Sequence, residues 1–166
     1  KYMEHEFVPE HPEQCENHIR MTWHHIDTHN TLIIKVINER VNDELWGYAM
    51  ANLRLFLRWV HAKDVKFHFI FDVHECMTVP AARMGEMLVY LKRKRPILLA
   101  KLHSSVVLTS NRFVQLLFDT AVPPGSTARP LQLMLVERKQ NCDRTYGIPA
   151  KAWEEACSFL RENRLP

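Results

Sequence analysis

The first clear pattern along the chain is an alternation of apolar and polar residues. Ile19, Met21 and Trp23 alternate with polar neighbours, and a period of two predicts a half-buried strand. Residues 27–30 have the composition of a turn, and residues 31–38 are apolar on both faces, as expected of a strand inside a sheet. The two segments and their short link predict an antiparallel hairpin over residues 18–38.

After the hairpin, helical and strand patterns take turns. Asn42 and two acidic residues predict the start of a helix, with an apolar stripe from Trp46 to Val60. The later predicted elements are a strand at 66–73, a helix from Thr78 to Pro96, a short helical turn at 97–102, a strand at 105–109, a helix at 111–122, a strand at 131–136, a polar loop at 137–146 and a helix from Pro149. The order β-β-α-β-α-β-α-β-α predicts an α/β fold in which the later strands are parallel.

Composition agrees with one globular domain of 166 residues. The chain is 46% hydrophobic and 25% charged with a net charge of +3, which excludes wholesale disorder. No apolar run approaches the roughly 20 residues of a membrane span, and four scattered cysteines do not form a disulfide framework. We divide the chain into an extended acidic arm at 1–17 and a single domain at 18–166. The absence of a secretory pattern favours the cytoplasm or an organelle matrix and leaves the compartment open.

Basic residues gather in the middle of the chain, where Lys92–Arg95 form the densest cluster. This cluster fits the last turn of a helix, where cations meet the negative end of the helix dipole. A nucleic-acid patch is the less favoured interpretation, because no aromatic platform lies beside the cluster, and an acidic protein partner is a further alternative. The candidate partner surface consists of Arg83, Lys92, Arg93, Lys94 and Arg95.

Over residues 18–164 the chain resembles the STAS domain, the domain of sulphate transporters and anti-sigma-factor antagonists. Four stretches carry the resemblance: the hairpin 18–38 before a helix, FHFIFDVHECMTVP with Asp72 at the end of its strand, SVVLTSNRFVQLLF, and IPAKAWEEACSFLREN. It implies a mixed five-stranded sheet backed by helices, a STAS-like fold of the anti-sigma-factor antagonist type. Lipid-binding domains of the CRAL-TRIO type share this broad topology and are the second choice.

The chain departs from that family at its phosphorylated serine. The bacterial antagonists carry Asp-Ser-Ser-Gly eight to eleven residues after the strand aspartate, where this chain has Pro80, Ala81, Ala82 and Arg83. Phosphoryl transfer needs an exposed hydroxyl at this helix start. The only hydroxyl nearby is that of Thr78, which we interpret as a helix cap. The phospho-acceptor position is therefore degenerate, and we do not expect the phosphorylation switch of the bacterial antagonists in this chain.

The sequence gives little support for a catalytic site or a metal site. His74 and Cys76 would share a face if their strand ran that far, but a buried cysteine is more often an apolar packing residue. The ten histidines show no paired ligand motif, so we expect surface histidines and no metal. Phosphate-cradling glycine loops are also missing. We therefore expect neither an enzyme nor a cofactor, and interpret Asp72 as bonding the following loop.

Lipid binding is the main alternative to an interaction role. A pocket between sheet and helices would be lined by five apolar residues, but the same residues fill a solid core equally well. They are Phe67, Phe69, Met84, Met87 and Phe113. We expect a non-enzymatic STAS-like interaction module or accessory subunit of a larger assembly. Its partners would be other protein subunits that contact the arm, the loop 137–147 or the basic surface, and we expect no nucleic acid.

Overall fold

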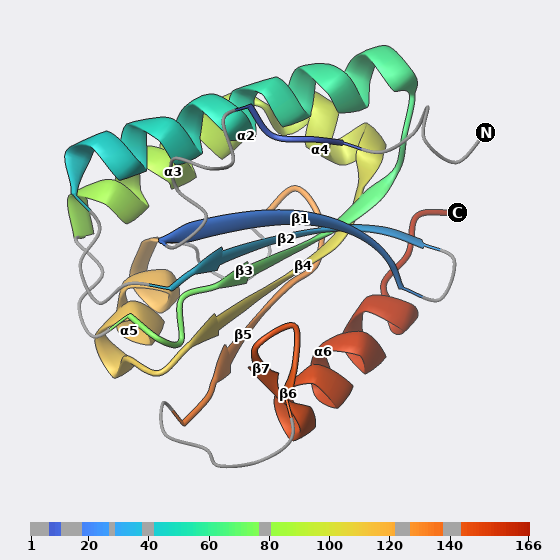
Figure 1. Cartoon of the computed structure of the whole chain (residues 1–166). Coiled ribbons are helices and arrows are strands. Elements are labelled where there is room, and N and C mark those ends of the chain that lie inside the picture. The colour runs from blue at the N-terminus through green and yellow to red at the C-terminus, as the bar shows by residue number, and fades with distance from the viewer. Residues whose placement is uncertain are drawn as a thin grey trace.

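The computed structural model shows a five-stranded mixed sheet with helices on both faces (Figure 1). It describes residues 7–10, 18–26, 29–37, 42–76, 81–121, 127–137 and 144–166. The strands lie in sequence order, β1-β2-β3-β4-β5. The β1–β2 pair is antiparallel and the other three pairs are parallel. This confirms the predicted α/β class, the hairpin and the mixed five-stranded sheet.

The strand bounds follow the sequence pattern, with one clear exception. The strands are β1 (Ile19–Ile26), β2 (His29–Val36), β3 (Phe67–Asp72), β4 (Leu102–Thr109) and β5 (Leu131–Leu135). β4 begins three residues earlier than predicted, at Leu102, which the sequence pattern assigned to the end of a helical turn. Phe67 pairs with Leu102 and Phe69 with Ser105, so β4 contains an extra residue there. This bulge places His103 and Ser104 in the sheet, and both are buried.

Three crossover connections cover one face of the sheet. Their helices are α2 (Asp43–Lys63), α3 (Ala81–Arg93), α4 (Arg95–Lys101) and α5 (Arg112–Ala121). Side chains from all four helices join the larger core cluster, together with Phe67, Phe69 and Phe71 of β3. None of the described helices is long and apolar enough to cross a bilayer.

Local signals explain where α2 begins and ends. The Asn42 side chain accepts a hydrogen bond of 2.8 Å from the backbone N–H of Leu45, which is the predicted cap. Asp64 ends the helix in the left-handed conformation, at φ 55°. At the junction of α3 and α4, Pro96 lies in the first turn of α4, where its missing N–H costs nothing. Thr78 and Pro80, predicted to start α3, lie outside the described residues.

The described part of the arm, residues 7–10, packs along α2 (Figure 1). The Phe7 ring lies 5.0 Å from that of Phe56 and 5.7 Å from that of Trp59, and Phe7 is only 7% exposed. Glu10 N–H donates to the Asn52 side chain at 2.8 Å. Phe7 is therefore part of the core, which the sequence pattern did not indicate because one isolated aromatic residue gives no periodic signal.

The opposite face of the sheet is covered by α6 (Ala150–Glu162). Its Ala152, Ala156 and Leu160 pack on apolar side chains of β2, β3 and β4, such as Ile33 and Ile70. The predicted polar loop ends in a small hairpin, β6 (Arg144–Thr145) and β7 (Ile148–Pro149), which leads into α6. The residues 138–143 lie outside the described part.

Candidate functional site

Ligands of parallel α/β sheets usually bind at the carboxyl ends of the strands, and here that edge holds a buried polar network. Lys35 and Asp72 are paired in register on β2 and β3, and the Lys35 ammonium lies 3.3 Å from the Asp72 carboxylate. The same carboxylate lies 2.5 Å from His74 Nδ1 and accepts from the His74 N–H at 3.1 Å. Asp72 thus bonds the following loop, as the sequence indicated.

The network is closed from the α6 side by the turn of the β6–β7 hairpin. The Lys35 ammonium donates to the Gly147 carbonyl at 2.8 Å, and Glu75 lies 3.7 Å away. Gly147 has φ +74°, and a Cβ on it would meet the Lys35 ammonium at 2.6 Å. Only glycine therefore fits this turn without displacing the lysine.

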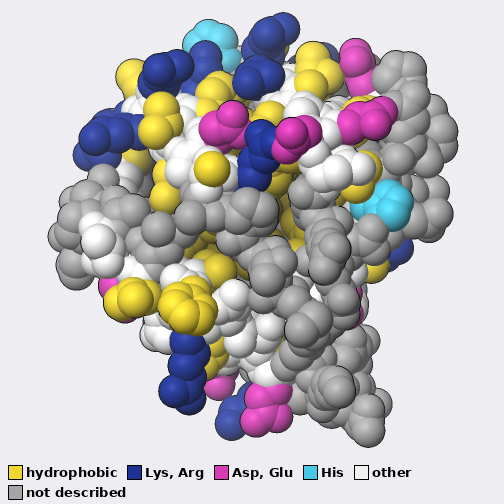
Figure 2. All heavy atoms as spheres, turned by 90° about the vertical axis from the view of Figure 1, so that its left-hand side faces the viewer, with side chains coloured by type: hydrophobic (Ala, Val, Ile, Leu, Met, Phe, Trp, Pro, Cys, Tyr) yellow, Lys and Arg dark blue, Asp and Glu magenta, His cyan; other side chains and the backbone are white. Residues whose placement is uncertain are grey.

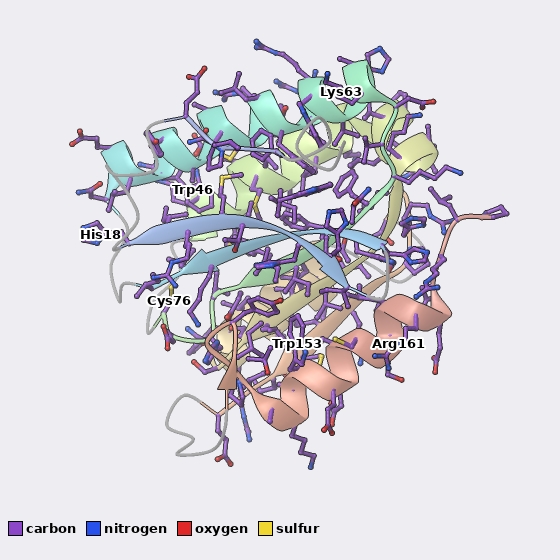
Figure 3. All side chains as sticks on the ribbon, turned by 45° about the vertical axis from the view of Figure 1, so that its right-hand side comes forward. His18, Trp46, Lys63, Cys76, Trp153 and Arg161 are labelled. Carbon is purple, nitrogen blue, oxygen red and sulfur yellow. The ribbon has the colours of Figure 1, made fainter. Side chains whose placement is uncertain are left out.

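His74 and Cys76 do not share a face of a strand, because β3 ends at Asp72 and the alternation of side chains between its two faces ends with it. His74 is fully buried, and its Nε2 has no hydrogen-bond partner among the residues that the structure describes. The Cys76 thiol donates to the Val36 carbonyl at 3.9 Å and packs in the larger core cluster. Cys76 lies near the end of the sheet at which α2 begins (Figure 3).

A second polar group lies at the other end of the strands, where three histidines of adjacent strands meet. The rings of His68 and His103 are 4.6 Å apart, and His29 lies 5.9 Å and 5.5 Å from them. The expectation of surface histidines is therefore wrong for His68 and His103, which the bulge in β4 helps to bury. Among the described residues, no group of three or more His, Cys, Asp or Glu side chains is arranged to hold a metal ion.

Of the five predicted pocket-lining residues, four lie in the core. Phe67, Phe69, Met84 and Met87 are buried together between the sheet and the helices. Phe113, in contrast, is 80% exposed on the outside of α5, so the structure does not bring it to the other four. At the degenerate phospho-acceptor position, Ala81 and Ala82 form the first turn of α3, and Ala82 is exposed.

A hollow with a volume of about 500 Å³ lies between α2 and α3. We call it the α2–α3 groove. The two helices run side by side in the same direction (Figure 1). They are joined by an ion pair between Arg83 and Asp43 and by a hydrogen bond of 3.0 Å from the Trp46 indole to Glu86. Trp46 is buried on the side of α2 that faces the sheet (Figure 3).

The groove combines positive charge with apolar surface. Three arginines line it, Arg54, Arg83 and Arg93, against two acids, Asp43 and Glu86. Both acids form ion pairs with Arg83, and the three arginines exceed the two acids by one positive charge.

Aromatic and aliphatic surface lies directly beside these charges. The Arg54 guanidinium lies 5.7 Å from the centre of the Tyr90 ring, and the Lys94 ammonium lies 5.9 Å from it. Burial raises the pKa of the Tyr90 phenol, which therefore stays neutral. Val89, also in the lining, is 51% exposed.

The predicted basic surface overlaps this groove. Arg83 and Arg93 line it, Lys94 contacts Tyr90, and Lys92 and Arg95 are exposed nearby on the same helical layer. Lys92 and Arg93 lie in the last turn of α3, as predicted. Figure 2 shows Lys and Arg side chains gathered over these helices, interleaved with hydrophobic ones, with Asp and Glu below them.

No protein-family model matches the chain, and neither the curated proteins nor the solved structures gave a significant match. The function is therefore argued from this chain's own residues. Sequence reasoning missed the α2 half of the groove. Arg54 is an exposed residue of α2, and nothing in the sequence indicates that α3 lies beside α2 with Tyr90 close to that arginine.

Proposed function

We propose that this protein is a non-enzymatic interaction module or accessory subunit with a STAS-like topology. It binds an acidic segment of a partner protein in the α2–α3 groove. The observation that carries the proposal is an excess of positive charge beside exposed apolar surface in one hollow, with Arg54 and Arg93 next to Val89 and Tyr90. Complementary charge steers such encounters, and arginine and aromatic residues are enriched where interfaces are most stable.

The fold part of this proposal rests on element order. The resemblance implies a hairpin followed by alternating helices and strands in a mixed five-stranded sheet, and the chain has this element order. The missing hydroxyls at Ala81 and Ala82 argue that binding is not switched by phosphorylation at that position. The lipid-carrier alternative has less support, because Phe67 and Met84 fill the core rather than line a hollow.

The groove suits a short segment with two features. Acidic side chains reach Arg54 and Arg93, and a leucine-sized or aromatic side chain covers Val89 and Tyr90. Both features are needed for affinity, since exposed ion pairs alone contribute only about 0–1 kcal/mol each. A double-stranded nucleic acid would satisfy the arginines but leave Val89 uncovered, so we commit to a peptide.

A random-peptide selection tests this without knowledge of the partner. We expect wild type to enrich peptides that combine Asp or Glu with an apolar anchor. A synthetic peptide from that pool, labelled for fluorescence anisotropy, should bind more weakly at 300 mM salt than at 50 mM. The groove variant Arg54→Glu/Arg93→Glu should lose this binding.

The matched control is Arg112→Glu/Lys151→Glu, which reverses two exposed bases outside the groove. It should bind the peptide like wild type at equal salt. Enrichment without acidic residues would refute the proposal, as would equal binding by the groove variant. Stronger binding of duplex RNA or of anionic vesicles than of any selected peptide would assign the groove to another partner.

A further inference from the structure

The histidine group, His29, His68 and His103, holds the segment that follows α6. We call these residues the histidine cluster and residues 163–166 the tail segment. The backbone N–H of Leu165 donates to His103 Nδ1 at 2.8 Å. The tail segment returns from α6 to the end of the sheet at which β3 and β4 begin (Figure 1). This contact joins residues 62 positions apart.

The hydrogen bond fixes the protonation state of His103. Nδ1 accepts the Leu165 N–H, so it carries a lone pair and the ring proton is on Nε2. A proton added to the ring would go to Nδ1 and would replace this bond by a contact between two donors. His68 is bonded as well, through Nδ1 to the Ser104 hydroxyl at 2.9 Å.

The groups around the cluster all disfavour added positive charge. Burial is the main cause that lowers the pKa of His68 to about 3 and that of His103 to about 4. Among the described residues, the neighbouring charges act in the same direction on these rings, and none of the contributors is acidic. They are Lys66 before β3, Arg129 before β5, Arg164 after α6, and His29 of β2.

We propose that the histidine cluster is an acid-sensitive latch for the tail segment. With His68 and His103 neutral, the His103 ring holds Leu165 against the sheet, and protonation of these two rings releases the tail segment. Release breaks the Leu165 bond to His103 and lets the charged rings reach water. The second contact, from the Lys66 ammonium to the Pro166 carbonyl at 3.2 Å, is exposed and does not hold the tail segment alone.

The expected size of the effect follows from linkage. In the closed form the pKa of His68 is about 3 and that of His103 about 4, whereas a solvated imidazole has a pKa near 6.5. Between pH 7.5 and 5.5, each ring that reaches water on opening therefore favours the open form by about tenfold. Exposure of both rings gives about a hundredfold, and exposure of His103 alone gives about tenfold.

Amide hydrogen exchange of the full chain measures this opening. The amide of Leu165, whose N–H donates to His103 Nδ1, is followed from pH 7.5 to 5.5, with its rate divided by the intrinsic rate at each pH. We expect its protection to fall by 10- to 100-fold, while the amides of β4 keep theirs. Constant protection of the tail segment overturns the latch. An equal loss in β4 overturns it too, because it indicates global unfolding.

Variants assign the effect to the cluster. His103→Gln keeps an acceptor for Leu165 but removes the titrating ring, so the pH dependence should shrink about tenfold. His68→Gln serves as a second variant if the first does not fold. The control His61→Gln alters an exposed histidine of α2 and should behave like wild type. An unchanged pH dependence in whichever cluster variant folds overturns the proposal.

Discussion

Removal of the Asp72 charge should be among the most damaging single changes in this protein. Asp72 is fully buried, and its carboxylate faces the Lys35 ammonium at 3.3 Å and the His74 ring at 2.5 Å. Asp72→Asn preserves the shape but removes the buried counter-charge of the Lys35 ammonium, which keeps only the partly exposed Glu75 carboxylate at 3.7 Å. Breaking a buried pair from one side costs about 3–5 kcal/mol. The Gly147 carbonyl still accepts from Lys35, so we expect about 3 kcal/mol.

A double-mutant cycle isolates the pair itself. Lys35→Met removes the cation and keeps the aliphatic stem, while Asp72 retains the His74 N–H as a donor. We expect the double variant to be less destabilised than the sum of the single variants by about 1–3 kcal/mol, because neither charge is then left alone. Urea unfolding at pH 7.5, followed by tryptophan fluorescence, gives each free energy of unfolding.

Asp64→Asn is the matched control, since it removes an aspartate that pairs with Lys101 at the surface. The Asp64 side chain is 82% exposed, and Asn tolerates the left-handed backbone there. Its cost should stay within about 0.5 kcal/mol. If Asp72→Asn costs no more than Asp64→Asn, or if the two single costs simply add, the network is not the buried ion pair described above.

Three further changes test separate features. Gly147→Ala should cost at least about 1 kcal/mol in urea unfolding, because the backbone is left-handed and the new Cβ meets Lys35; a neutral change would contradict this close approach. Phe7→Ala should cost about 3 kcal/mol and lower the melting temperature in circular dichroism, and an unchanged melting temperature would show that the arm does not dock. Asn42→Ala should cost about 1 kcal/mol by the same method, with Asn42→Ser close to wild type.

The strands and helices that carry strong periodic patterns were predictable, since hydrophobic period and capping residues act locally. The Asn42 cap and the apolar strand 31–38 are examples. Contacts between distant residues were not. The β4 bulge, the short hairpin before α6 and the docking of Phe7 all depend on neighbours far along the chain. For the same reason the sequence indicated the basic residues of α3 but not the groove that they share with α2.

The two faces of the sheet are completed at different times during synthesis. Helices α2 to α5 alternate with the strands along the chain, so helices cover one face of the sheet as successive strands are added. On the other face, α6 covers Ile33, Ile70 and Val106, and this helix is synthesised after all five strands. A nascent chain stopped before residue 144 therefore exposes an apolar sheet surface and is prone to aggregate. Both faces of the sheet are covered only once α6 has been made.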